Sequence, residues 1–328
     1  ILESIIRQAP PASNLIKETI FKYKDEFRRI LVLNSDGVFI ADQQPSIDIH
    51  LACTAEVKGR SQRAAADLGN RCGVDTLTNE SLLVSMNRVS ARAVELLSTA
   101  PISSGEYPVL LSPQATSALV HSWYLYEKTD ETTGQTRTRG PIPRHLTLAD
   151  NGRIVNARGT SHFDDEGTFT SRTYIVRDGQ RTNQLNRRFL TSSKEARLTG
   201  NARRASFDRL PEIAPTNLYI ESTLGPSDLG RADLENGLYI SEMIPHGQAS
   251  HHGQFQYLVK SGWLVKNGGD EHPVQNLLIN VRFPDILHRI DAAGLEPEFY
   301  PAYFGPNRIP GSCGGSHLSI SKLSVRQL

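Results

Sequence analysis

Four short segments of the sequence carry side chains that could perform chemistry. In the first, His121 lies in a stretch with helical character and could offer an imidazole to a metal ion. Ser122 stands where a glutamate would follow such a histidine, and no second histidine comes four or five positions later. The helix that binds zinc through two histidines and activates water with a glutamate is therefore not formed by this segment. A partly buried histidine that is satisfied by a neighbour is the alternative.

The second segment is an acidic run of Asp164, Asp165 and Glu166, which directly follows Phe163. Adjacent carboxylates could bind a metal ion or act as general acid and general base. Asp165 and Glu166 are the candidate catalytic residues on this interpretation. A solvated turn is the alternative, because runs of charge are common at the surface.

The third segment places His246, His251 and His252 within seven positions. Three imidazoles are enough nitrogen donors for a zinc or nickel ion. Consecutive residues of a strand point to opposite faces, so His251 and His252 could both be ligands only if the backbone turns there. His246 and His252 could share one face of a hairpin.

The fourth segment surrounds Cys313 with glycines, in the order Gly-Ser-Cys-Gly-Gly. A cysteine in this setting has an approachable sulfur, which could bind zinc or act as a nucleophile beside a base. A tight turn with a small residue is the alternative. The run lacks the lysine and the spacing of a phosphate-binding loop.

The N-terminal part of the chain, residues 1–101, has a mixed helix and strand pattern. A charged helix is expected over 15–29, followed by a hairpin whose turn is at 34–37. A third strand is expected over 47–52. Apolar residues recur at three- and four-residue spacing over 80–97, which predicts a helix with Asn79 as its N-cap.

After Pro101 the segments become short, β-branched and separated by turns. The expected strands cover 107–111, 173–176, 217–221, 238–243, 256–265 and 277–281. Helices are expected over 115–126, starting at Ser112 or Pro113, and over 283–293, and a loop over 128–143. The predicted fold class is α+β, with an α/β lobe in residues 1–101 and a large antiparallel, barrel-like β domain with a few helices in 102–328.

The composition excludes several classes of protein. Among 328 residues, 36 Lys and Arg balance 35 Asp and Glu, which argues against a protein held directly on nucleic acid by phosphate neutralisation. No stretch has the roughly 18 apolar residues that a membrane span requires. Three cysteines in so long a chain favour a reducing, cytoplasmic setting. The first residue is Ile1, so we expect that part of the N-terminal lobe is missing from this sequence.

Several segments, taken in order, resemble the TldD/PmbA family, whose second member is also called TldE and which carries the historical label "modulator of DNA gyrase". The matching segments are 34–38, 104–110, 162–168, 172–179, 199–204 with Thr216 and Asn217, and 261–268 with 272–274. Phe163 and the 261–265 segment are closer to the TldE branch, whereas 199–204 is closer to TldD. Each segment alone is weakly specific, but their shared order covers about 290 residues.

The resemblance implies that the candidate metal site has lost some of the residues that bind zinc in TldD. TldD is a zinc peptidase with a His-Glu-x-x-x-His helix and a further cysteine ligand near the C-terminus. His121 and Cys313 match two of these ligands, whereas Ser122 replaces the glutamate and Tyr126 the second histidine. The resemblance therefore implies no zinc in this chain and a zinc ion in its partner.

The hypothesis that follows is a TldE-like subunit, which forms a heterodimer or a larger assembly with a TldD-like chain and acts on unfolded or small peptides. Asp164, Arg203, Arg204 and His252 would then shape the substrate chamber or the interface between subunits.

A second hypothesis is a self-sufficient metallohydrolase, for example one that processes natural products. His121 and Cys313 would bind zinc with a third ligand from 246–252, and a carboxylate such as Glu166 would replace the lost base. A third hypothesis is a binding or scaffold protein that uses the old cleft for a peptide.

Overall fold

The fold is known from a computed structural model, which describes residues 13–35, 37–73, 79–128, 140–188, 197–226, 228–247 and 253–328. About 51% of the chain is in strands and 15% in helices. The fold is α+β with a closed barrel of five strands, which confirms the predicted class. No helix of the described residues is both long and apolar enough to cross a membrane.

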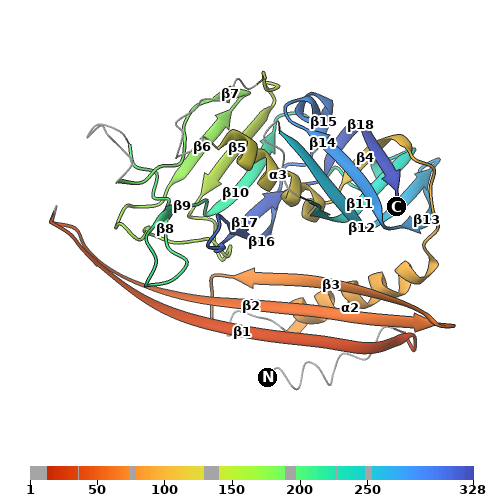
Figure 1. Cartoon of the computed structure of the whole chain (residues 1–328), viewed down its shortest axis with the longest axis horizontal. Helices are drawn as coiled ribbons and strands as arrows, with labels where there is room; N and C mark the ends of the chain where they lie inside the picture. The colour runs from red at the N-terminus through yellow and green to blue at the C-terminus, as the bar shows by residue number, and fades with distance from the viewer. Residues whose placement is uncertain are drawn as a thin grey trace.

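The N-terminal lobe is a curved sheet of three long antiparallel strands with a helix on one face (Figure 1). Its elements are β1 (Ile16–Leu33), β2 (Phe39–Val57), β3 (Arg60–Asn70), α2 (Asn79–Glu95) and the 3-10 helix η2 (Leu96–Ser98). A core of its own, built from residues such as Leu51, Leu82 and Val89, joins β2 and β3 to α2. The helix predicted over 80–97 is confirmed, whereas the side chain of its proposed cap Asn79 lies outside the described residues.

The predicted helix over 15–29 is wrong, because this segment forms β1. The charged residues alternate with Phe21 and Tyr23, whose side chains pack on the core beside α2, while Lys22 and Lys24 are exposed. Period two is the pattern of a strand, and pairing with β2 along its whole length overrides the helical propensity of Lys and Glu. The hairpin turn at 34–37 is confirmed by the Asn34 N–H, which donates to the Val38 carbonyl at 3.1 Å. The strand predicted over 47–52 is the middle of β2.

Beyond α2, the hairpin tip (Phe27–Leu33 and Phe39–Pro45) continues as a two-stranded ribbon (Figure 1). Its inner face meets the C-terminal part of the chain at Gly167, where an added Cβ would lie 2.9 Å from Val38 Cγ1. Its outer face leaves apolar side chains 55–72% exposed, namely Phe27, Leu31, Leu33 and Phe39. The tip is thus buried on one side and apolar on the other.

The barrel consists of β11, β4, β18, β14 and β12, and pairing of β12 with β11 closes it. The bounds are β4 (Gly105–Leu111), β11 (Gly237–Pro245), β12 (Gln254–Lys266), β14 (Leu277–Arg282) and β18 (Leu318–Gln327). Two shorter strands, β13 (Gly269–Val274) and β15 (Ile290–Ala293), pair with β12 and β18. The predicted helix over 283–293 is wrong: a 3-10 turn η5 (Asp285–Arg289) leads directly into β15. Proline at 284 lacks an amide hydrogen, and the apolar residues that follow pair with β18 instead.

A second sheet of six strands lies beside the barrel. In sheet order it contains β16 (Glu298–Phe304), β17 (Ile309–Gly315), β10 (Asn217–Ser222), β5 (Leu146–Asn151), β6 (Arg172–Arg177) and β7 (Gln180–Arg181). A small ribbon, β8 (Ala202–Arg203) with β9 (Glu212–Ile213), and the 3-10 turn η4 (Arg231–Asp233) complete the described elements. All six strands predicted after Pro101 are present.

Helix α3 (Pro113–Glu127) lies between the barrel and the six-stranded sheet (Figure 1). Ser112 caps it as predicted, because its hydroxyl accepts a hydrogen bond from the Ala115 N–H at 3.1 Å. The helix approaches β17 closely: a Cβ added to Gly315 would lie 2.6 Å from the Thr116 side chain. The glycines around Cys313 therefore belong to a strand that a helix packs against, not to the tight turn considered from the sequence. The loop expected over 128–143 falls mostly on residues 129–139, which lie outside the described residues.

Candidate active-site cleft

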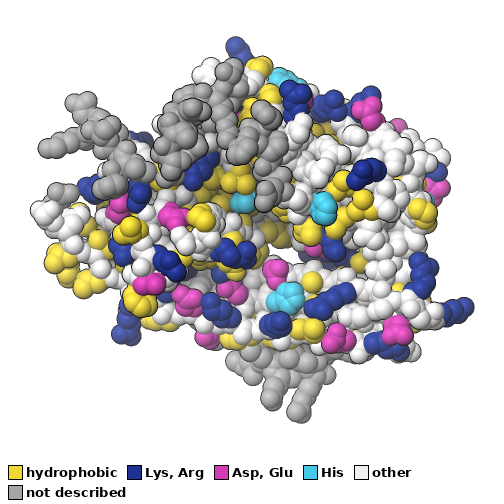
Figure 2. Space-filling model, in the orientation of Figure 1, with side chains coloured by type: hydrophobic (Ala, Val, Ile, Leu, Met, Phe, Trp, Pro, Cys, Tyr) yellow, Lys and Arg dark blue, Asp and Glu magenta, His cyan; other side chains and the backbone are white. Residues whose placement is uncertain are grey.

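The main cleft lies between the N-terminal sheet and the C-terminal part of the chain, and its volume is about 1000 Å³. Figure 2 shows this hollow, with basic, acidic and histidine side chains along its edges. One wall is formed by β1, β2 and β3, and the other by α3, β11, β16 and β17. Both His121 and Cys313 line it, so the structure brings together the two residues that were candidate metal ligands.

His121 faces the cleft from the side of α3 that also carries Gln114, Ser117 and Ala118, as helical spacing requires. Its ring lies 5.3 Å from that of Phe304. Burial lowers the pKa of His121, and a hydrogen bond to the Tyr303 backbone offsets this in part. The imidazole is therefore neutral at pH 7, the form that can bind a metal ion or accept a proton.

Cys313 is buried in the middle of β17, between Leu218 of β10 and Tyr300 of β16. Burial raises the pKa of its thiol well above the ordinary value, and the Asp150 carboxylate raises it further. A thiol that holds its proton is a poor nucleophile, because the thiolate is the reactive form. The setting of Cys313 therefore does not support nucleophilic catalysis.

The two replaced positions of the zinc helix point into the protein. Ser122 is 2% exposed, and its hydroxyl donates to the Ala118 carbonyl at 3.3 Å. Tyr126 is 7% exposed and stacks on Phe283 with ring centres 5.5 Å apart. Neither side chain supplies a zinc ligand or a water-activating carboxylate at the cleft.

A catalytic zinc ion needs three protein ligands and a water molecule. In the part of the chain that the structure describes, no group of three or more His, Cys, Asp and Glu side chains could hold a metal ion. His246 is exposed, and its backbone N–H donates to the Gln256 carbonyl at 2.8 Å. His251 and His252 lie outside the described residues. The described residues thus do not fit a complete zinc site.

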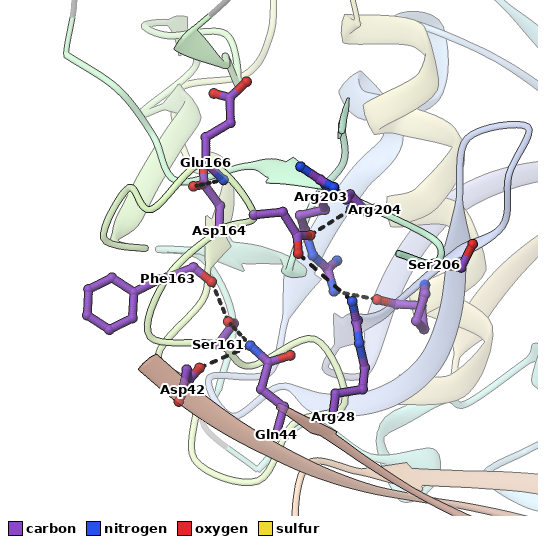
Figure 3. A network of polar contacts seen from close by, with 12 residues as sticks. Arg28, Asp42, Gln44, Ser161, Phe163, Asp164, Glu166, Arg203, Arg204 and Ser206 are labelled. Atoms are coloured by element: carbon purple, nitrogen blue, oxygen red, sulfur yellow. Dashed lines mark hydrogen bonds and ion pairs between the residues drawn. The ribbon is translucent and has the colours of Figure 1, made fainter. Parts of the chain in front are cut away.

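The acidic element (residues 163–169) is a tight turn beside the hairpin tip, and its residues are not among those that line the main cleft (Figure 3). Asp164 is 5% exposed and accepts hydrogen bonds from the backbone N–H groups of Glu166, Thr168 and Ala202, at 3.0, 2.8 and 3.0 Å. Burial raises its pKa to about 6, against these bonds, which lower it. Asp164 acts here as the centre of a turn.

The two carboxylates that were proposed as catalytic are bound in the same manner. Asp165 accepts from the Arg204 N–H at 2.7 Å and lies 3.9 Å from the Arg28 guanidinium. Glu166 accepts from the Arg188 N–H at 2.7 Å. Their catalytic roles stay predictions, and the geometry gives each of them a structural partner.

Arg203 is buried beneath this element. Its guanidinium donates to the carbonyls of Pro215 and Pro310, at 2.5 and 2.6 Å. Burial lowers its pKa to about 10, although the nearby Asp150 and Asp165 carboxylates raise it. It therefore joins the β8–β9 ribbon to β17, a placement consistent with shaping the fold around the cleft.

Sequence reasoning did not single out the polar residues of the cleft that come from the N-terminal lobe. Asp48 and His50, on β2, face Arg158 and Asp67. On the other wall, Tyr303 and Arg308 flank the turn between β16 and β17. The signal was weak, because each lies in an ordinary alternating strand or beside a Gly-Pro turn, and only tertiary packing brings them together.

A closed five-stranded barrel and a six-stranded sheet, with a helical histidine and a strand cysteine that line one cleft, define an α+β protein with a barrel-like β domain. The family models described as "PmbA/TldA metallopeptidase central domain" and "PmbA/TldA metallopeptidase C-terminal domain" match residues 1–100 and 104–327. The chain belongs to the PmbA/TldD family, which confirms the resemblance read from the sequence.

Relatives with curated descriptions agree with this assignment. A metalloprotease of Synechocystis is 25% identical over 327 residues, which cover 95% of this chain and 69% of that protein. A TldD homologue of Buchnera aphidicola is 25% identical over 82% of this chain and 58% of its own length. A protein of Saccharolobus solfataricus named as a zinc metalloprotease TldD homologue is 23% identical, over 99% of this chain and 74% of its own. The chain thus spans only part of the length of each.

Solved structures share the fold at low identity. A candidate modulator of a DNA gyrase from Thermotoga maritima superposes with a TM-score of 0.75 and 18% identity, over 99% of this chain and 72% of that one. TldE from Thermococcus kodakarensis gives a TM-score of 0.69 with 16% identity, over 93% of this chain and 67% of that one. At this level of identity the likeness establishes the fold alone.

Proposed function

We propose that this chain is a TldE-like subunit that assists a zinc-bearing TldD-like partner in peptide hydrolysis in the cytoplasm. The observation that carries the proposal is that the described residues of the cleft supply only part of a catalytic zinc site. They include His121 and a protonated Cys313, while Ser122 and Tyr126 are buried in the helix. Without a water-activating carboxylate beside a three-ligand metal, amide hydrolysis needs help from a partner.

Two sheet edges at the cleft support a role in peptide binding. Strands β3 and β16 each stand at the edge of their sheet among the described strands. Both contribute to the lining of the cleft, through residues 65–68 and 300–303. An extended peptide that adds to such an edge is held by its backbone, so binding depends little on sequence. This supports unfolded or small peptides as the substrate class.

The outer face of the hairpin tip is a suitable surface for the partner. Leu31 and Leu33 on β1 and Phe39 on β2 share this face and are 67, 72 and 68% exposed. Apolar side chains that gather on one exposed face mark interaction sites. We propose that the TldD-like chain binds this face, because the hairpin tip extends beyond the part of the molecule that contains the cleft (Figure 1).

A self-sufficient metallohydrolase is the second candidate, and one observation favours it. Strand β11 ends at Pro245, which lines the same cleft as His121, and the connection that carries the histidines of 246–252 follows it directly. A ligand from this connection would therefore start near the helix that carries His121.

Metal analysis and peptidase assays distinguish the candidates. The chain is purified alone and with a TldD-like product, and zinc content and cleavage of an unfolded peptide are measured. We expect substoichiometric zinc and no cleavage for the chain alone, and cleavage with the partner. Near-stoichiometric zinc and activity in the isolated chain, lost in Cys313→Ala but kept in the control Cys53→Ala, would overturn the proposal in favour of the second candidate.

A further inference from the structure

Each carboxylate that lines the main cleft contacts a basic side chain. Asp48 accepts two hydrogen bonds from the Arg158 guanidinium, one of them at 2.6 Å. Asp67 lies 2.7 Å from His50. The remaining carboxylate in the lining, Glu242, pairs with Arg92 at 2.9 Å. The acidic groups of the cleft are therefore already occupied.

Two cations of the same cleft have no such partner among the described residues. Lys22 projects from β1, and Arg308 lies in the turn between β16 and β17 on the opposite wall. Of the other basic groups in the lining, Lys24 pairs with Glu26 at 3.2 Å. Figure 2 shows Lys and Arg side chains on both sides of the hollow. The cleft thus presents an excess of positive charge to whatever enters it.

Arg308 is held in place close to His121. Its guanidinium carbon lies 4.5 Å from the centre of the Tyr303 ring, whose other neighbour is Arg158 at 5.3 Å. The backbone of Tyr303 in turn bonds His121. Stacking on an aromatic ring restricts the guanidinium but leaves its N–H edge available for a ligand.

We propose that the cleft selects peptides that carry a carboxylate, which Arg308 binds while Lys22 attracts it from the facing wall. A planar guanidinium suits a carboxylate because two parallel N–H groups can donate to its two oxygens. The proposal rests on the proposed peptide-binding role of the cleft. The carboxylate could belong to an acidic side chain or to the C-terminus of the peptide, since both offer the same two oxygens.

The test measures binding of fluorescent alanine-based peptides to the full chain by anisotropy at low and high salt. Three peptides are compared: one with a central Glu and blocked ends, its Gln counterpart, and the Gln peptide with a free C-terminus. We expect at least one carboxylate-bearing peptide to bind several-fold to tenfold more tightly than the blocked Gln peptide at low salt. High salt should reduce this difference.

Substitutions then assign the effect to its residues. Arg308→Gln should bring the ratio close to one, Lys22→Gln should lower it in part, and Arg308→Lys should retain much of it. Lys17→Gln is the matched control, because Lys17 lies on the same strand but outside the cleft lining, and it should leave the ratio unchanged. Circular dichroism of each variant verifies that it is folded.

The outcomes separate this inference from the proposed function. If no peptide binds the chain or its complex, the cleft is not a peptide site and both fail. If the Glu, Gln and free-end peptides bind equally, the charge selection fails while the peptide-binding role stands. A preference confined to one carboxylate supports the inference and identifies the source of that group.

Discussion

In the acidic element every carboxylate accepts a backbone N–H, whereas in the cleft the side chain of His121 borders a volume that a ligand can enter. Both regions combine titratable groups with burial. They differ in the partners of these groups. The Asp164 carboxylate accepts hydrogen bonds from the chain itself, whereas the His121 side chain lines a volume that a ligand can enter.

This difference separates residues that hold a fold from residues that can meet a substrate. A carboxylate with three amide donors has little capacity left for a ligand, and its loss damages the turn. A half-buried imidazole with one backbone contact can be replaced at little cost in stability. The same comparison therefore predicts effects of very different size for substitutions in the two regions.

The largest effect is expected for Asp164→Ala. It leaves three backbone N–H groups without their acceptor, so the free energy of unfolding should fall by about 2–4 kcal/mol in urea denaturation. Glu166→Ala is the matched control, because it removes a single bond to Arg188 at the surface and should cost under about 1 kcal/mol. Equal losses in the two variants would contradict the structural role of Asp164.

A smaller effect concerns pH. The pKa of Asp164 is raised to about 6, above its ordinary 3.8, so the native state keeps a proton that the unfolded chain releases. Protonation thus stabilises the fold below about pH 4, and the free energy of unfolding should fall by roughly 2–3 kcal/mol as the pH rises to about 6. Asp164→Asn, which does not titrate, should be less stable but lack this component. If the free energy of unfolding changed with pH equally in the wild type and the variant between pH 4 and 6, the contribution of Asp164 would be refuted.

The smallest effect on stability is expected for His121→Gln, under about 1 kcal/mol at pH 7. Burial lowers the pKa of His121, so an NMR titration of its ring protons should give a midpoint below 6.5. The unfolded chain then binds the proton more readily, and this contribution to stability is lost as the pH falls below the ordinary histidine range. A large loss of stability at pH 7 in His121→Gln would mean that His121 has a structural role like that of Asp164, and it would contradict the difference between the two regions.

Much of the fold was predictable from local pattern. Strands such as β12 and β14 follow segments rich in apolar residues between turn residues, and α3 begins at a proline that follows a capping serine. The failures lie where tertiary pairing wins over propensity. Strand β1 is rich in Lys, Glu and Arg, yet it pairs with β2 over its whole length. The segment 283–293 does not form the expected helix, because its last residues pair with β18.

The site was predictable only in part. His121 and Cys313 could be placed in one cleft through motif positions, although 192 residues separate them in the sequence. The acidic run attracted a catalytic interpretation because a sequence does not show which donors a carboxylate will meet. Arg308 carries no motif, and its stacking on Tyr303 follows from the turn that joins two strands.

The contact of Gly167 with the inner face of the hairpin tip has a consequence for association. Val32, Val38 and Ile40 pack around this glycine, so the hairpin tip is already held in position before a second molecule binds. Much of the conformational entropy that a free ribbon would lose on docking is thereby already lost in folding. A preorganised hairpin tip of this kind allows a modest apolar surface to support a long-lived complex.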